Sequence, residues 1–416
     1  MFNLNINLKF KFFIIYIFLI DSMIGLIIGF NELTYWLVLL NSIIIPIVLL
    51  TTNSRVLTEF IFILGLLMMI SFSTFNLFIW YITFEVVLIP MIYIISKGSA
   101  SINSRYRALL RFTLYTILGG ILLLLGLSIL FINVGSYNYW SYVLNSSAFG
   151  SLDLKLELIL FPINLIPYLL KLPVIPFHLW LPDTHGEAPT SGSIYLAAIL
   201  LKLGGIGLLR WLIPIFPFGY LYYRPLIMIL GLVSAILASI ICIRHIDLKK
   251  LIAYSSIAHM GILLVGLTSI NKISIKGFIL ILFSHGLVSS LLFLLIGILY
   301  VRTKTRYLYY YKGLATSMPI FSTFLFIGLI LNSSIPPSLS FFAELHLLQG
   351  AFINEFIGTT HSLIAVFFSG IYSLLLFTRI IFSKISNNHW SDLKLREFII
   401  ALPLVLLSFL LITIID

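Results

Sequence analysis

LIPYLLKLPVIPFHLWL, which runs from Leu165 to Leu181, is an apolar stretch that holds three prolines and one lysine. A proline inside a helix removes a backbone donor and clashes with the preceding turn, so a membrane helix is expected to open here, between about Pro167 and Pro176. Non-helical backbone is tolerated at this depth only where protein or water surrounds it. Lys171 lies in the same place, and a lysine at the centre of a membrane helix costs roughly 2.5 to 3.5 kcal/mol on insertion scales. The stretch therefore predicts a discontinuous membrane helix with an ionisable group beside its break.

The rest of the chain is similarly apolar. Of its 416 residues, 61% are hydrophobic and 9% are charged, whereas about a quarter of the residues in an ordinary soluble protein are charged. Apolar runs of about 20 residues, long enough to cross a bilayer core of roughly 30 Å, recur from end to end and leave no room for a soluble catalytic domain. Glycine-rich nucleotide motifs and a nucleophile elbow are absent from the sequence. The chain is therefore predicted to be an all-α polytopic membrane protein without nucleotide or acyl-transfer chemistry.

We expect thirteen transmembrane helices in a single membrane domain, 1–416, with the sixth and eleventh helices discontinuous. Their predicted positions are 12–30, 34–51, 56–75, 77–96, 106–132, 158–182, 190–212, 222–243, 249–270, 275–301, 314–350, 361–383 and 396–415.

The net charge of +11 is distributed unevenly over the loops that join these helices. Eighteen basic residues fall on the N-terminal side: Lys9, Lys11, Arg55, Lys97, Arg105, Arg107, Arg111, Arg244, Lys249, Lys250, Arg302, Lys304, Arg306, Lys312, Arg379, Lys384, Lys394 and Arg396. Five fall on the other side: Lys155, Arg210, Arg224, Lys272 and Lys276. Because positive residues are retained inside, we interpret the charge as a topology signal, not as nucleic-acid binding, and place the N-terminus inside and the C-terminus outside.

A second break is expected at SSIPPS, Ser333 to Ser338. Broken helices at corresponding places in two halves are typical of inverted-repeat transporters. We therefore predict two inverted five-helix repeats, 56–212 and 222–383, followed by a C-terminal helix at 396–416. Lys171 and Glu344 would occupy equivalent places near the two breaks. Proline kinks without symmetry remain an alternative, because the halves share no visible residue pattern.

Ionisable residues inside the apolar runs are the candidate functional groups. Glu85 lies in FIWYITFEVVLIPMIYII, Lys202 in YLAAILLKLGGIGLL, His285 in FSHGLVSS and Glu344 in PPSLSFFAELHLLQGAF. Intramembrane acids and bases usually serve ion or proton movement, and a carboxylate in contact with an ammonium changes the proton affinity of both. We expect Glu85 to pair with Lys171. A static ion pair and a packing role for His285 remain open.

Metal and thiol chemistry have little support in the sequence. Cys242 is the only cysteine, so disulfides and Cys-ligated clusters within the chain are excluded. His178, His185 and His259 match no ligand spacing, so no metal site is predicted. Gly204 and Gly205 are interpreted as sites of close helix packing. Asp21 has no assigned role.

KLPVIPFHLWLPDTHGEAPTSGSIYLAAILLKLGGIGLLR, Lys171 to Arg210, resembles the central signature of the NADH dehydrogenase subunit 4 family, the antiporter-like membrane-arm subunits of respiratory complex I. FEVVLIPM around Glu85, DLKKLIAYSSIAHMG from Asp247 to Gly261, SHGLVSSLLF around His285 and FFAEL around Glu344 extend the resemblance over residues 34 to 383. The family has fourteen membrane helices, so one early helix is missing from this chain by our count.

The resemblance implies a proton-translocating subunit without a redox centre of its own. Glu85 and Lys171 would be the pair, Lys202 the central relay, His285 a connecting group and Glu344 the terminal acid. NADH, flavin, iron–sulfur clusters and ubiquinone would be bound by other subunits, with no cofactor or metal in this chain.

The expected partners are the sister antiporter-like subunits, other membrane-arm subunits and lipids, but no nucleic acid. Mitochondrial inner membrane is the expected location, with a bacterial plasma membrane as the alternative. The competing functions are a subunit of a cation/proton antiporter and a scaffold that does not translocate protons.

Overall fold

The computed structural model describes residues 32–52, 54–98, 101–144, 153–382 and 390–410. In this part of the chain the regular secondary structure is helical, and nine helices or helix runs are long and apolar enough to cross a membrane. The prediction of an all-α polytopic membrane protein is confirmed. Each predicted span from 34–51 onward coincides with a described helix or run of helices, whereas the first span, 12–30, and Asp21 lie outside the described residues.

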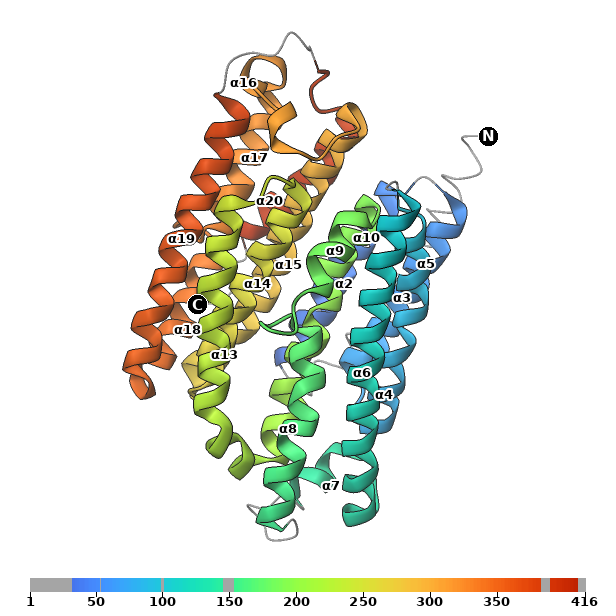
Figure 1. Cartoon of the computed structure of the whole chain (residues 1–416), viewed down its shortest axis with the longest axis vertical. Helices are drawn as coiled ribbons and strands as arrows, with labels where there is room; N and C mark the ends of the chain where they lie inside the picture. The colour runs from blue at the N-terminus through green and yellow to red at the C-terminus, as the bar shows by residue number, and fades with distance from the viewer. Residues whose placement is uncertain (1–31, 53, 99–100, 145–152, 383–389, 411–416) are drawn as a thin grey trace. The chain divides into compact units, whose positions relative to one another are not determined.

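The chain divides into two compact units, Met1–Leu226 and Ile227–Asp416. The helices of the first unit, shown in Figure 1, are α2 (Glu32–Thr51), α3 (Arg55–Ser73), α4 (Leu77–Val86), α5 (Leu88–Ser96), α6 (Ile102–Val134), α7 (Tyr139–Leu144), α8 (Leu154–Lys171), α9 (Trp180–Glu187), α10 (Thr190–Tyr195), the π-helical η2 (Leu196–Leu200), α11 (Lys202–Ile206), the π-helical η3 (Gly207–Leu212), α12 (Ile213–Ile215) and the beginning of α13 (Pro217–Arg244).

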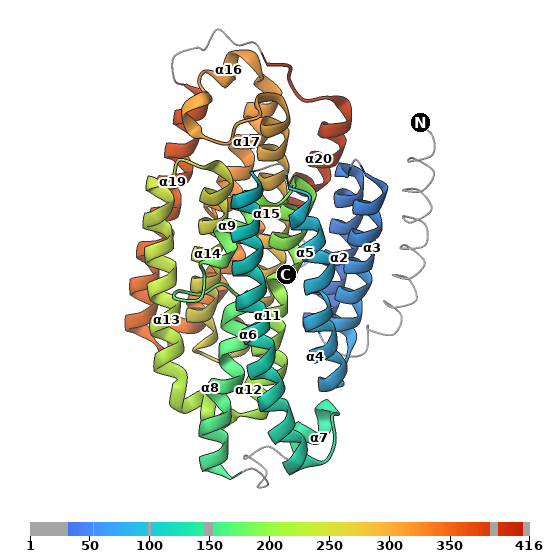
Figure 2. The same cartoon turned by 45° about the vertical axis from the view of Figure 1, so that its right-hand side comes forward.

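Within this unit α2 packs on α3, and α6 runs beside α8 and α9, as Figure 2 shows from a second side. The span that carries Glu85 is interrupted at Val87, between α4 and α5. Pro90 explains the interruption, because it has no N–H for the carbonyl of Val86 and its ring clashes with that carbonyl. The outward face of α6 exposes Leu114, Leu118 and Ile121, which suits contact with lipid or with apolar neighbours.

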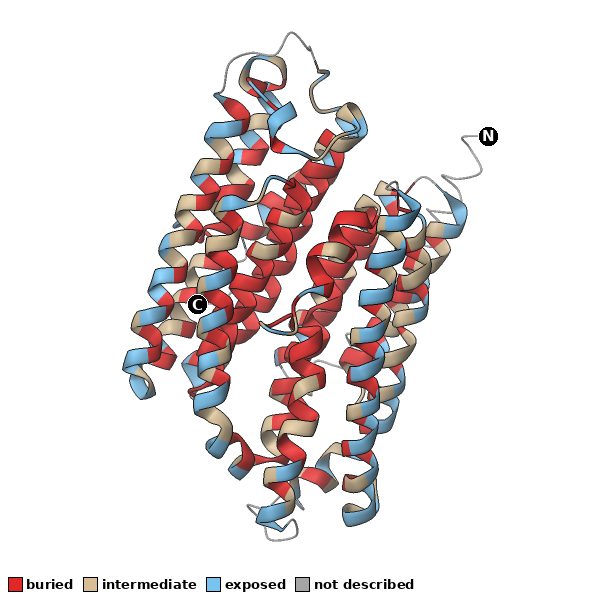
Figure 3. Ribbon diagram, in the orientation of Figure 1, coloured by how far each residue is buried: buried red, intermediate tan, exposed pale blue. Residues whose placement is uncertain are grey.

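The second unit contains the rest of α13, then α14 (Leu248–Leu267), α15 (Lys272–Thr303), η4 (Leu308–Tyr310), α16 (Leu314–Ser317), α17 (Pro319–Asn332), α18 (Leu339–Asn354), α19 (Phe356–Ile381) and α20 (Leu395–Leu410). In Figure 3, α14 and α15 are almost entirely buried, whereas α13 and α19 keep exposed faces. Asp247 caps α14 and Asn271 caps α15, the latter in a capping box with Ser274.

Both broken helices are present, but one break is displaced from its predicted position. The second falls at Ser333–Ser338, between α17 and α18, as predicted. The first falls between Lys171 and Trp180, so it begins inside the predicted interval from Pro167 to Pro176 and extends beyond its end. Pro162 and Pro167 lie inside α8. Each proline leaves one backbone carbonyl without its intrahelical donor, and neighbouring groups in a helix bundle can satisfy such a carbonyl.

The two units repeat one local arrangement. Asn76, the N-cap of α4, forms an isolated β-bridge with Asn138, and Asp247, the N-cap of α14, forms one with Tyr307. In each case the partner follows the next long helix, α6 or α15, and the broken helix comes after it. The repeat limits 56–212 and 222–383 themselves remain a prediction.

Candidate functional site

Glu85 lies in the last turn of α4, with its carboxylate against the backbone of α6 at Gly120. A β-carbon built on Gly120 would stand 2.3 Å from Glu85 Oε1. In the part of the chain that the structure describes, Oε1 is buried and has no hydrogen-bond partner. The carboxylate is therefore held by the shape of its surroundings more than by donors.

Lys171 is the last residue of α8 and is buried. Its Nζ donates to the carbonyl oxygen of Phe84 at 3.4 Å and lies 4.4 Å from the centre of the Phe84 ring, which adds a cation–π attraction. The charges of Glu85 and Lys171 interact electrostatically. Among the described residues, however, no direct ion pair joins them, so the predicted contact is wrong in this state. Lys171 instead contacts the backbone of Phe84, the residue directly before Glu85.

Lys202 begins α11 and lies between the two π-helical turns η2 and η3. Its side chain is fully buried, and Nζ donates to the carbonyl oxygen of Ala197 at 2.6 Å. Such π-helical turns occur often at functional sites. The sequence did not predict them, because no residue type marks a π-turn.

The glycines beside Lys202 bring α11 and η3 against α8. A β-carbon on Gly204 would be 2.7 Å from the carbonyl oxygen of Tyr168, and one on Gly207 would be 2.4 Å from the Tyr168 ring. The predicted role of Gly204 in close helix packing is confirmed. Lys202 therefore lies in a helix that contacts the end of α8, where Lys171 is found.

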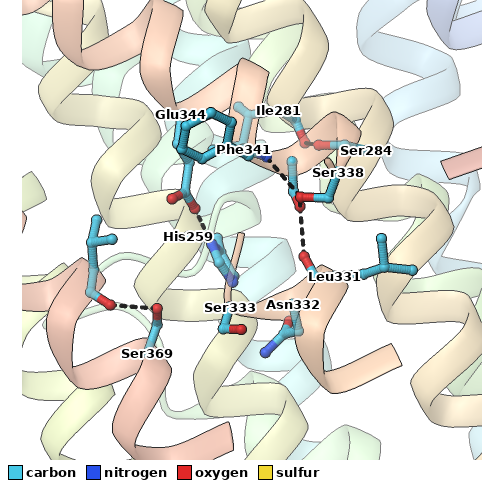
Figure 4. Close-up of polar contacts among 12 residues, drawn as sticks. His259, Ile281, Ser284, Leu331, Asn332, Ser333, Ser338, Phe341, Glu344 and Ser369 are labelled. Carbon is cyan, nitrogen blue, oxygen red and sulfur yellow. Dashed lines mark hydrogen bonds and ion pairs between the residues drawn. The ribbon is translucent and has the colours of Figure 1, made fainter. Parts of the chain in front are cut away.

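In the second unit, His259 of α14 and Glu344 of α18 form a buried hydrogen bond of 3.0 Å between Nδ1 and Oε1 (Figure 4). The ring of His285, from α15, is centred 5.8 Å from the ring of His259. The sequence singled out Glu344 and His285 but considered His259 only as a metal ligand. Its position in an apolar span, like that of His285, was the available signal.

Glu344 lines two pockets, a small one and a larger one. The small pocket, of about 10 Å³, is lined by His259, Ser284, His285, Asn332, Ser340 and Glu344 among others. It is close to the space that one water molecule requires. The larger pocket, of about 520 Å³, is lined by Glu344 and by apolar side chains that include Phe341, Leu348, Phe352 and Leu363. Glu344 thus adjoins both the small space beside the two histidines and the larger pocket.

Lys171 and Glu344 do not occupy equivalent places, contrary to the prediction. Lys171 ends the first half of its broken helix, whereas Glu344 lies in the second half of the other. The residue that ends the first half of the second broken helix is Asn332, whose Nδ2 donates to the hydroxyl of Tyr372 at 3.2 Å. Within the described residues, no group of three or more His, Cys, Asp or Glu side chains could hold a metal ion.

Known proteins resemble the chain over most of its length. A family described as NADH:quinone oxidoreductase/Mrp antiporter, transmembrane, matches residues 74–371. NADH-ubiquinone oxidoreductase chain 4 of Chondrus crispus is 39% identical, over 91% of this chain and 78% of that protein. NADH-quinone oxidoreductase subunit M of Rickettsia prowazekii is 36% identical, over 81% of this chain and 68% of the relative. A chain in the structure of respiratory complex I from Thermus thermophilus with bound NADH has a TM-score of 0.83 and 26% identity, over 92% of this chain and 81% of that chain.

Proposed function

We propose that this chain, which belongs to the NADH:quinone oxidoreductase/Mrp antiporter transmembrane family, is the chain 4 subunit of a respiratory complex I and translocates protons across its membrane. The observation that carries the proposal is the buried His259–Glu344 hydrogen bond, with the His285 ring nearby, inside the membrane-spanning helices of the second unit. Burying several neighbouring titratable groups in a membrane costs free energy, and such groups are typical of proton relays.

The geometry supports a distinct role for each group. Glu85 and Lys171 form a loosely coupled acid and base, since no direct hydrogen bond must break for the carboxylate to move. Lys202, held by a backbone carbonyl, would carry the proton through the centre of the first unit. His259, His285 and Glu344 would pass it through the second unit. Histidine suits this task because it titrates near neutral pH and has two ring nitrogens that can take and release the proton.

The reaction served would be proton-translocating NADH:ubiquinone reduction. This chain would hold no redox centre, and other subunits would bind NADH, flavin, iron–sulfur clusters and ubiquinone. Its partners would be the sister antiporter-like subunits and the surrounding lipids. The two five-helix repeats, 56–212 and 222–383, would each contribute half of the relay. Relatives come from eukaryotes and from Rickettsia, and we favour the mitochondrial inner membrane over a bacterial plasma membrane.

A cation/proton antiporter subunit is the second candidate, since the description of the family includes Mrp antiporters. The 39% identity to a complex I chain 4 favours the first candidate. Purification of the native assembly distinguishes them: flavin and iron–sulfur subunits should accompany the chain in a complex I, and their absence would indicate the antiporter.

The test of proton translocation is Glu85→Gln in the assembled complex. Glutamine keeps the shape of the side chain but cannot ionise, so the changing proton affinity of Glu85 and Lys171 is lost. Moving one charge against 100 mV requires about 2.3 kcal/mol, which a relay without that change cannot supply. Protons moved per NADH oxidised in vesicles should fall strongly. Lys171→Arg should fail as well, because arginine does not release its proton.

Glu59→Gln is the matched control, because Glu59 is an exposed acid that pairs with Arg55 one turn away. It should leave proton movement unchanged. Wild-type stoichiometry in the assembled Glu85→Gln complex would show that Glu85 is structural.

A further inference from the structure

Three glycines of α6 face other helices of the first unit, and each contacts a different kind of atom. A β-carbon on Gly119 would lie 3.3 Å from the flexible end of Leu170, and one on Gly126 would lie 2.4 Å from the amide of Asn164. At Gly120 the three nearest atoms all belong to the carboxylate of Glu85: Oε1 at 2.3 Å, Cδ at 2.4 Å and Oε2 at 2.6 Å. The Glu85 carboxylate therefore occupies the space that a side chain at position 120 would fill.

This placement differs from an ordinary buried carboxylate. Buried acceptors nearly always have a donor, yet Glu85 Oε1 has none among the described residues. Lys171, whose charge interacts with Glu85, directs its Nζ to the carbonyl of Phe84. With no donor on Oε1, the carboxylate is positioned by its contact with Gly120. It can leave this contact without breaking a hydrogen bond to Oε1.

We propose that Gly120 is a positioning residue of the proton relay: its missing side chain provides the groove in which the Glu85 carboxylate rests while Lys171 binds the backbone. The proposal rests on the proposed role of Glu85 in proton transfer. Any larger residue at position 120 displaces the carboxylate, because real β-carbons are essentially never found within 3.0 Å of another heavy atom. Alanine, which adds one methyl group and favours helix, is the smallest such change.

The experiment compares Gly120→Ala with Gly119→Ala in the assembled complex. The control adds the same methyl to the adjacent residue, where only the end of Leu170 must adjust. Gly120→Ala should lower protons moved per NADH below the wild-type value, with the complex still assembled. Gly119→Ala should keep wild-type stoichiometry. Equal losses in both variants would mean that α6 tolerates no added methyl here, and would overturn a specific role for Gly120.

Shortening the acid provides a rescue. Aspartate at position 85 is one methylene shorter and draws the carboxylate back from α6. Residues in contact show non-additive effects, so the double variant Gly120→Ala/Glu85→Asp should move more protons than Gly120→Ala alone. A merely structural defect of α6 would not be relieved by shortening Glu85.

A second readout, independent of pumping, is the rate at which a hydrophobic carbodiimide labels residue 85, measured by peptide mass spectrometry. A carboxyl displaced from its groove is more accessible, so Gly120→Ala should label Glu85 faster than wild type does, whereas Gly119→Ala should label it at the wild-type rate. In the Glu85→Asp background, adding Gly120→Ala should change the labelling rate of residue 85 by a smaller factor. This readout decides the question even if Glu85→Asp alone does not pump.

The outcomes separate the two proposals. Unchanged labelling and unchanged pumping in Gly120→Ala would overturn the role of Gly120 and leave the proposed function intact. Faster labelling in Gly120→Ala, combined with wild-type pumping in Glu85→Gln, would support the groove and refute the role of Glu85 in proton transfer.

Discussion

Gly277→Ala is predicted to open the His259–Glu344 hydrogen bond without changing either residue. A β-carbon on Gly277 of α15 would lie 2.5 Å from the backbone nitrogen of Leu347 and 2.9 Å from the carbonyl carbon of His346. Both atoms belong to the backbone of α18, so no side chain can rotate away. Ordinary contact begins near 3.4 Å, and the difference between 3.4 Å and 2.5 Å requires α18 to move by about 0.9 Å.

The shift is large compared with the tolerance of the pair. The clash displaces α18 from α15, and a displacement of that size directed along the hydrogen bond would lengthen the distance from His259 Nδ1 to Glu344 Oε1 from 3.0 Å to at most about 3.9 Å, beyond the range of a hydrogen bond. A hydrogen bond to a charged group contributes about 1.5 to 3 kcal/mol, and every 1.4 kcal/mol is a factor of ten in population. Overpacking itself costs about 1 to 3 kcal/mol. We expect the paired geometry to be populated about tenfold less or lower, with a comparable fall in proton movement.

The assay is proton movement per NADH oxidised in vesicles that contain the assembled complex, together with its thermal unfolding. Gly370→Ala on α19 is the control, because a β-carbon there meets no atom within 4 Å. It should preserve both pumping and stability. Wild-type pumping in an assembled Gly277→Ala complex would refute the argument that the backbone contact of α15 and α18 sets the His259–Glu344 distance.

Two further predictions concern stability. Glu157 is fully buried, and its Oε1 accepts the N–H of Gly219 in the first turn of α13. Glu157→Ala should therefore lower the free energy of unfolding by about 0.5 to 2 kcal/mol, as loss of a helix cap does. An unchanged thermal midpoint of the assembled complex would contradict this. Burial and then Lys250 lower the pKa of His245 in the loop after α13, against the opposing effect of Asp247. Neutral His245 therefore contributes stability above its unfolded pKa of about 6.5 that is lost as pH falls through the lower folded pKa. His245→Gln should flatten the loss of thermal stability on acidification, and an equal pH slope in both proteins would show that His245 does not cause it.

The sequence predicted the features that follow from strong local chemistry. SSIPPS ends helix where expected, because adjacent prolines and small polar residues cannot continue it. Four charged residues were identified because each stands alone in an apolar run: Glu85, Lys171, Lys202 and Glu344. The exact break after Lys171 was missed, since tertiary packing keeps α8 helical through Pro162 and Pro167. The pairing of His259 with Glu344 was missed because its hydrogen bond joins residues 85 positions apart, although the position of His259 in an apolar span marked it as it marked His285.

The pairing in the two units shows why sequence position alone could not identify equivalent residues. In the first unit the acid, Glu85, is on the helix that follows the bridged N-cap Asn76, and the base, Lys171, is on the broken helix. In the second unit the base, His259, is on the helix that follows the bridged Asp247, and the acid is on the broken helix.

The acid and the base are thus on opposite helices in the two units. On the broken helix, Lys171 ends the first half in the first unit, whereas Glu344 lies inside the second half in the second unit. A change of one partner alone would leave two acids or two bases beside each other, which is unfavourable when both are charged and buried. Each pair therefore constrains its own two helices, and the correspondence between the units lies in which helices meet, not in which residue type each helix carries.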